Sequence, residues 1–152
     1  MNRIFSVIPL FLLAACAGPK EPLVVKQFTL RDQEQDRRGD PMIAMEKARR
    51  LHGAISLEER RKKLGQYYTL AWNDSANSGQ GAPKLVFQYQ QGATGSRVKR
   101  MTTNFPATSV NGTAEFAVIG DDYFKGGKVL AWKAILLRGD REIASQQSYL
   151  WR

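Results

Sequence analysis

The chain has 152 residues, 43% of them hydrophobic, which suits a single domain of ordinary size with a packed core. This balance argues against disorder over the whole chain. Lys and Arg number 23 against 14 Asp and Glu, so the formal net charge is +9. Such an excess attracts anionic lipid, acidic polysaccharide or nucleic acid without choosing among them. The single cysteine excludes an internal disulfide.

Residues 1–15 have the layout of a secretory signal peptide. Arg3 gives the start a positive charge, and residues 4–13 are apolar apart from Ser6 and Pro9. This apolar run is far shorter than the roughly 20 residues that a membrane-spanning helix needs. We therefore expect residues 1–15 to be cleaved rather than to form a transmembrane helix.

The leader ends in Leu13-Ala14-Ala15-Cys16, which resembles the lipobox of bacterial lipoproteins. The resemblance implies that the Cys16 thiol forms a thioether to diacylglycerol, that a type II signal peptidase cuts before Cys16, and that the new α-amine is acylated. A cysteine is required because the thiolate is the nucleophile. The alternative is an ordinary signal peptide that is cut after Ala15 or Ala17. Because Ala17 is not Asp, the resemblance favours the outer membrane over the inner membrane.

Residues 16–23 are predicted to be a short lipidated tether, since they contain one glycine and two prolines. Apolar residues at even spacing in residues 24–30 predict a strand. Together with two short helices, this strand is expected to form an N-terminal segment over residues 24–65.

The first helix is predicted from its N-terminal signals. Asp40 is a good N-cap, and Pro41 suits the first helical position. Met42, Met45, Ala48 and either Leu51 or His52 then recur at helical spacing.

The second helix is predicted to begin at Ser56, because Ser56 and Glu59 form the S-x-x-E capping box. Acidic residues lie at its start and basic residues lie toward its end, an order that complements the helix macrodipole. Gly65 closes the helix. Its four basic residues are Arg60, Arg61, Lys62 and Lys63.

Residues 66–152 are predicted to form a β-sandwich, because short alternating segments are separated by turn signals. The expected strands cover residues 66–72, 84–90, 97–103, 113–119, 128–137 and 142–151. Residues 120–127 are expected to be a turn, and residues 139–140 the tip of a hairpin. Residues 128–137 are apolar on both faces and are expected to be a central strand that is covered on both sides.

The fold expected from these segments is mainly β, an antiparallel immunoglobulin- or fibronectin-like sandwich of about 6–7 strands with the two helices at one end or edge. Residues 65–69 (GQYYT) and 121–127 (DDYFKGG) resemble segments of uncharacterised bacterial lipoproteins with an immunoglobulin-like sandwich. That resemblance implies no activity.

The residue inventory predicts no enzyme, no metal site and no cofactor. His52 is the only histidine, and its position near the end of the first helix fits a cap or a surface residue better than a general base. One histidine and one cysteine exclude the usual zinc ligand set, and nucleophile and phosphate-loop motifs are absent. Asp121 and Asp122 could ligate calcium, but turns use Asp for local hydrogen bonds.

Two groups of residues are candidates for binding. Trp72 and Trp151 lie near predicted strand ends, where exposed aromatic faces could stack on a glycan, whereas Trp132 in the central strand is expected to lie in the core. The four basic residues of the second helix could contact anionic lipid headgroups. The alternative for these four residues is a solvated helix end.

These observations predict a lipid-anchored lipoprotein of the bacterial cell envelope. We expect a non-enzymatic interaction or structural module that docks an envelope protein or complex. The alternative is a glycan-binding lipoprotein that recognises peptidoglycan or a surface polysaccharide through exposed aromatic residues. An enzyme is the weakest hypothesis. Nucleic acid is not an expected partner, because the leader exports the protein.

Overall fold

The structure, a computed structural model, describes residues 21–32, 40–75 and 81–152. Cys16 and the predicted signal peptide lie outside the described residues. The described elements are β1 (Leu23–Leu30), α1 (Pro41–Leu51), α2 (Leu57–Lys63), β2 (Gly65–Asn73), β3 (Pro83–Gln91), β4 (Lys99–Asn104), β5 (Asn111–Ile119), α3 (Gly120–Gly126), β6 (Val129–Arg138) and β7 (Arg141–Gln147). Strands predominate, so the mainly β prediction is confirmed.

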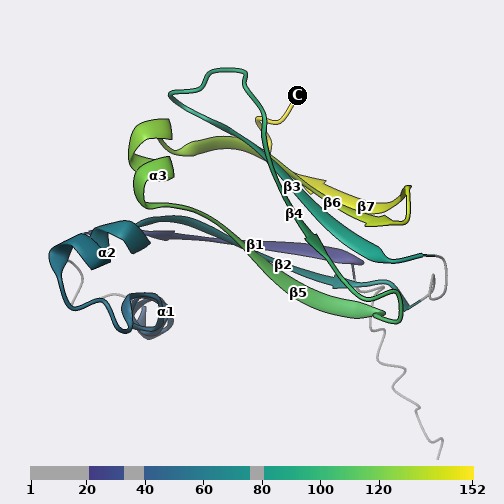
Figure 1. The fold of residues 1–152 in the computed structure, drawn as a ribbon, viewed down its shortest axis with the longest axis horizontal. Helices are drawn as coiled ribbons and strands as arrows, with labels where there is room; N and C mark the ends of the chain where they lie inside the picture. Colours follow the sequence, from purple (N-terminus) through teal and green to yellow (C-terminus); the bar gives the residue numbers. More distant parts are fainter. Residues whose placement is uncertain (1–20, 33–39, 76–80) are drawn as a thin grey trace, which may run out of the picture.

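The seven strands of the described residues form two antiparallel sheets, which lie face to face (Figure 1). One sheet has the order β1-β2-β5, and the other has the order β4-β3-β6-β7. β1 pairs with β2 along its whole length, from Leu23 opposite Trp72 to Leu30 opposite Gly65. The β unit therefore begins at Leu23 and includes the strand that was expected to belong to a separate segment over residues 24–65.

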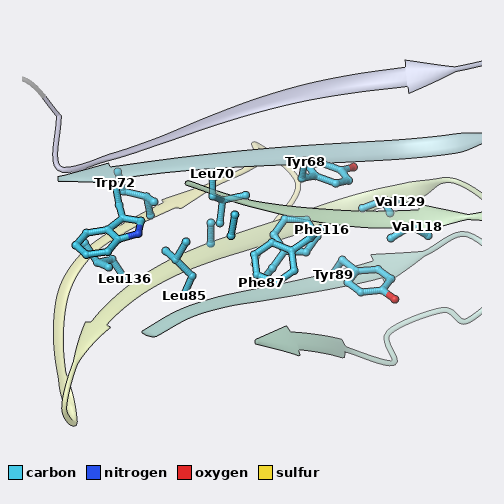
Figure 2. Packing of buried hydrophobic residues seen from close by; sticks show 13 residues of the cluster. Tyr68, Leu70, Trp72, Leu85, Phe87, Tyr89, Phe116, Val118, Val129 and Leu136 are labelled. Atoms are coloured by element: carbon cyan, nitrogen blue, oxygen red, sulfur yellow. The ribbon is translucent and has the colours of Figure 1, made fainter. Parts of the chain in front are cut away.

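The core lies between the two sheets, where the inward side chains of both sheets meet (Figure 2). Phe87 occupies its centre and has no exposed surface. The centroid of its ring lies 4.6 Å from that of Tyr68 and 5.5 Å from that of Phe116, distances at which aromatic rings attract one another. The alternation predicted for residues 84–90 and 113–119 is correct, because every residue expected to face inward is buried. These residues are Leu85, Phe87, Tyr89, Ala114, Phe116 and Val118.

β6 is the central strand that the pattern of residues 128–137 predicts, with β3 and β7 on either side. The prediction that both of its faces are covered is wrong. A bulge leaves Leu130 as an extra residue, because Val129 and Ala131 pair with successive residues of β3. Leu130 is 55% exposed, and the outward side chains beyond it are half-buried. The apolar residues on both faces of β6 therefore reflect the bulge at Leu130 and outward side chains that are only half-buried.

The prediction of a turn at residues 120–127 is also wrong, because the helix α3 occupies most of this segment. Asp121 and Asp122 lie in its first turn, where carboxylates offset the positive end of the helix dipole. Gly127 follows the helix with φ 78°, a left-handed conformation that favours glycine. A helix of seven residues has too few apolar positions for its period to be recognised in the sequence. The acidic residues Asp121 and Asp122 before the glycine at position 127 were the only sign of this helix.

At the end of the sheets that is remote from α3, a buried arginine holds the loops together. The side chain of Arg138 is 1% exposed, and its Nε donates a hydrogen bond to Asp74 at 2.7 Å. Its terminal nitrogens donate to the backbone carbonyls of Gly81 and Ser109 at 2.9 and 3.0 Å. Arg138 therefore ties β6 to the segments before β3 and before β5.

The hairpin predicted at residues 139–140 is confirmed, and it joins β6 to β7. β7 ends at Gln147, whereas the predicted strand continued to residue 151. The chain turns instead, because the Trp151 amide donates to the Ser148 carbonyl at 3.0 Å.

We expect Phe87→Ala to lower the free energy of unfolding by about 3–5 kcal/mol, because the lost ring leaves a cavity between the sheets. Leu130→Ala is the matched control, since Leu130 is half-exposed, and it should change stability by less than about 1 kcal/mol. Urea denaturation followed by circular dichroism measures both values. Equal effects of the two substitutions would contradict the assignment of the core.

Candidate interaction surface

The helix α1 begins as its sequence predicts. Asp40 is its N-cap, and the Asp40 carboxylate accepts a hydrogen bond from the Met42 amide at 2.8 Å. Pro41 occupies the start of the helix, where its missing N–H costs nothing. The helix ends at His52, the C-cap residue.

Arg50 attaches α1 to the outer face of the β1-β2-β5 sheet. Its side chain is only 4% exposed. The two terminal nitrogens donate to Glu115 on β5 at 3.0 and 2.7 Å, and Nε donates to Glu46 one turn earlier at 2.7 Å. The guanidinium also lies 3.7 Å from the ring centroid of Tyr67 on β2. Burial raises the pKa of Tyr67, so its phenol is neutral beside the cation.

Met42 and Met45 in the first turns of α1 are 70% and 67% exposed, whereas Leu51 at its end is half-buried and packs against the cluster of Leu30, Leu64 and Tyr67. Met45 lies five positions before Arg50, about 140° around the helix axis, and therefore faces away from the sheet. The helical spacing of Met42, Met45 and Ala48 therefore belongs to an outward stripe and not to a core face. Beside it, Met45, Ala48, Arg49 and His52 line a shallow hollow.

The helix α2 has the predicted capping box. The Ser56 hydroxyl accepts from the Glu59 amide at 3.1 Å, and the Glu59 carboxylate accepts from the Ser56 and Ile55 amides at 2.9 and 2.8 Å. At the other end, Lys63 Nζ donates to the His52 carbonyl at 2.6 Å and so ties α2 to the end of α1. These bonds fix the linker between the two helices.

Five large apolar side chains are exposed on α1, on the linker and at the start of α2. We call this surface the helical patch. Its members are 58–90% exposed, and Ile55, held by the capping box, is the most exposed of them. A concentration of exposed apolar side chains on one part of a domain marks an interaction surface. The members are Met42, Ile43, Met45, Ile55 and Leu57.

The four basic residues that were predicted as a lipid contact lie beside the helical patch, but they have different surroundings. Arg60, Arg61 and Lys62 are exposed, whereas Lys63 is half-buried. Lys62 forms an ion pair with Glu58 at 3.0 Å. Arg61 lies over the ring of Phe124 at 4.8 Å. A groove of about 360 Å³ separates α2 from α3, with charges of both signs along its walls.

The tryptophans predicted to bind a glycan lie elsewhere. Trp72 is 3% exposed and packs with its ring centroid 5.1 Å from that of Phe105, so its face cannot stack on a sugar. The expected exposure of Trp72 is wrong because β2 turns this residue into the core. Trp151 is half-buried in the C-terminal turn beside Tyr149, which is 95% exposed. Of the two tryptophans, only Trp151 therefore remains a candidate for stacking on a glycan.

The acidic pair on α3 is held by cations of the chain. Asp121 pairs with Lys125 at 2.9 Å, and Asp122 pairs with Lys99 and accepts a hydrogen bond from Tyr89 at 3.1 Å. The hydrogen bond and the charge of Lys125 lower the pKa of Asp121. Within residues 21–32, 40–75 and 81–152, no group of three or more His, Cys, Asp or Glu is arranged to hold a metal ion.

Comparisons with protein-family models, with curated proteins and with solved structures find no match to this chain. In the part of the chain that the structure describes, no helix combines the length and hydropathy needed to cross a membrane. The helical patch is therefore interpreted from its own chemistry.

The sequence predicted α1 and α2 but not the patch. Ile43, Ile55 and Leu57 have no special spacing, and which face of α1 meets the sheet depends on Arg50. The available signal was the run Glu46-Lys47-Ala48-Arg49-Arg50, in which a glutamate lies four residues before an arginine. That pair predicts a charged surface, whereas Arg50 is buried.

We expect Arg50→Met to lower the free energy of unfolding by about 2 kcal/mol, because it removes the charged hydrogen bonds from the buried guanidinium to Glu115 and Glu46. Arg49→Met is the matched control, since the Arg49 side chain is 61% exposed, and it should destabilise the fold much less than Arg50→Met. Hydrogen exchange should accelerate in α1 of the Arg50 variant and stay unchanged in β3. Equal exchange of α1 in both variants would contradict the role given to Arg50.

The pKa of Glu46 is lowered from 4.5 to about 2, most strongly by its hydrogen bond from Arg49 and further by the charge of Arg50. A carboxyl with a lowered folded pKa stabilises the fold above its unfolded pKa, and this stabilisation is lost as the pH falls through the folded pKa. We expect about 1 kcal/mol to be lost between pH 4.5 and 2, since Glu46 is partly screened by solvent. The free energy of unfolding, measured in urea across this pH range, should fall by this amount more in the wild type than in Glu46→Gln. Parallel pH profiles of the two proteins would contradict the role given to Glu46.

Proposed function

We propose that the chain is a bacterial envelope lipoprotein, anchored through diacylglyceryl-Cys16, whose folded part is a non-enzymatic interaction module. The anchor rests on the lipobox and its leader. The helical patch carries the proposal for the folded part, because the Arg50–Glu115 pair and the capping box of α2 fix the two helices and the linker that expose five apolar side chains. The outer membrane is the proposed location.

We propose further that the fold is a fibronectin-like sandwich. In the constant-type immunoglobulin arrangement, the fourth strand lies in the sheet of the first two strands. Here β4 pairs with β3 instead, and β1, β2 and β5 form the smaller sheet. That order is the fibronectin type III arrangement, which supports the proposal.

The proposed anchor and the helical patch belong to opposite ends of the domain. The tether leads into β1 at Leu23, whereas Leu30 at the other end of β1 pairs with Gly65, which directly follows α2 and its C-cap (Figure 1). The eight residues of β1 span about 25 Å. The tether, residues 16–22, reaches at most about 24 Å when extended.

We expect mass spectrometry of the mature protein to find an N-terminal Cys16 that carries diacylglycerol and an amide-linked acyl chain, because the lipobox predicts this processing. The lipidated protein should leave membranes only in detergent, since buried acyl chains make release negligible. The control has Cys16→Ser and a type I signal peptide in place of residues 1–15, and high salt should release it. A mature N-terminus at Ala17, or an unmodified Cys16, would refute the anchor.

A further inference from the structure

We propose that the helical patch docks on an anionic lipid bilayer, with its apolar side chains in the headgroup region and the adjacent basic residues at the phosphates. This inference rests on the proposed lipid anchor, which brings the domain to a membrane, and it names the partner of the interaction surface. The occupant is the bilayer that holds the anchor.

The apolar part of the argument is the chemistry of the patch. Its five members are two methionines, two isoleucines and a leucine, all flexible or aliphatic, and they lie on a short helix and the linker after it. Exposed aliphatic side chains on a short helix and its linker suit insertion into the headgroup region of a bilayer.

Charge complementarity is the second part of the argument. Helices that lie in a membrane interface combine an apolar face with Lys and Arg at its border. Residues 40–65 carry seven Lys or Arg and four Asp or Glu. Arg49, Arg60 and Arg61 are exposed on the two helices that carry the patch; Arg49 also pairs with Glu46, and Arg61 lies over the Phe124 ring. Each basic residue near an anionic leaflet adds to the attraction, so the border of the patch matches a surface of phosphates.

The geometry then fixes an orientation. The tether enters at one end of the β unit and the patch lies at the other, so both reach the same bilayer only when the domain lies along it (Figure 1). α1 lies on the outer side of the β1-β2-β5 sheet, where Arg50 contacts Glu115. That sheet consequently faces the membrane, and the β4-β3-β6-β7 sheet faces away from it.

Methionine oxidation tests the inference on the whole lipidated protein. Once the leader is removed, the chain has three methionines, of which Met42 and Met45 belong to the patch and half-buried Met101 lies on β4. The protein is reconstituted in phosphatidylcholine vesicles with or without about 30% phosphatidylglycerol and treated with peroxide. We expect Met42 and Met45 to oxidise about fivefold more slowly in the anionic vesicles, and Met101 to oxidise equally in both.

Matched variants separate lipid contact from a general charge effect. Arg60→Glu with Arg61→Glu should abolish the protection of Met42 and Met45, and Ile55→Ser should reduce it. Arg97→Glu with Arg100→Glu makes the same change of charge at exposed positions on and beside β4, and should leave the protection intact. Unchanged thermal unfolding shows that each variant is folded.

Three outcomes would overturn the inference. The first is equal oxidation of Met42 and Met45 in both kinds of vesicle, and the second is protection that survives Arg60→Glu with Arg61→Glu. The third is protection only when envelope proteins are added, which would assign the patch to a protein partner. Mass spectrometry of the same sample reports Cys16 separately. A lipidated Cys16 without protection refutes this inference alone, and protection of an unlipidated chain refutes the anchor alone.

Discussion

The attachment of α1 to the sheet depends on one buried guanidinium. Arg50 needs a partner for its charge once it leaves water, because an uncompensated buried charge is strongly destabilising. Its partners come from four elements: Glu46 on α1, Glu115 on β5, and the rings of Tyr67 on β2 and Phe28 on β1. These contacts fix the rotation of α1 about its own axis. The outward position of Met45, about 140° around the helix axis from Arg50, is a consequence of that rotation.

A buried arginine organises each end of the domain, but the two arginines have different effects. At one end, Arg138 binds Asp74 and two loop carbonyls and gathers the loops over the core. At the other end, Arg50 holds a helix outside the core and leaves apolar surface in solvent. Between them, Phe87 and its aromatic neighbours join the two sheets. The core supplies stability, and the arginines determine what is presented at each end.

The sequence was sufficient wherever a local rule decides the structure. Alternation identified the inward residues of β3 and β5, and Asp40, Ser56 and Glu59 identified both helix starts. It was insufficient wherever the answer depends on a contact between distant residues. Periodicity shows which residues of α1 share a face, but only Glu115, 65 positions away, decides which face meets the sheet. The bulge at Leu130 and the burial of Trp72 likewise depend on strand pairing.

The arrangement of α1 carries two costs on a single helix. A buried ion pair is often no more stable than well-packed apolar residues in its position, and an exposed apolar patch favours aggregation. The attachment of α1 also uses an apolar contact, since half-buried Leu51 packs against the cluster of Leu30, Leu64 and Tyr67. Rotating α1 by about 140° would bring Met45 to the sheet but would withdraw Arg50 from Glu115, and Ile55 and Leu57 would stay exposed because they lie outside α1. Docking on a bilayer, as proposed above, would offset the exposure of the helical patch by moving it into an apolar phase.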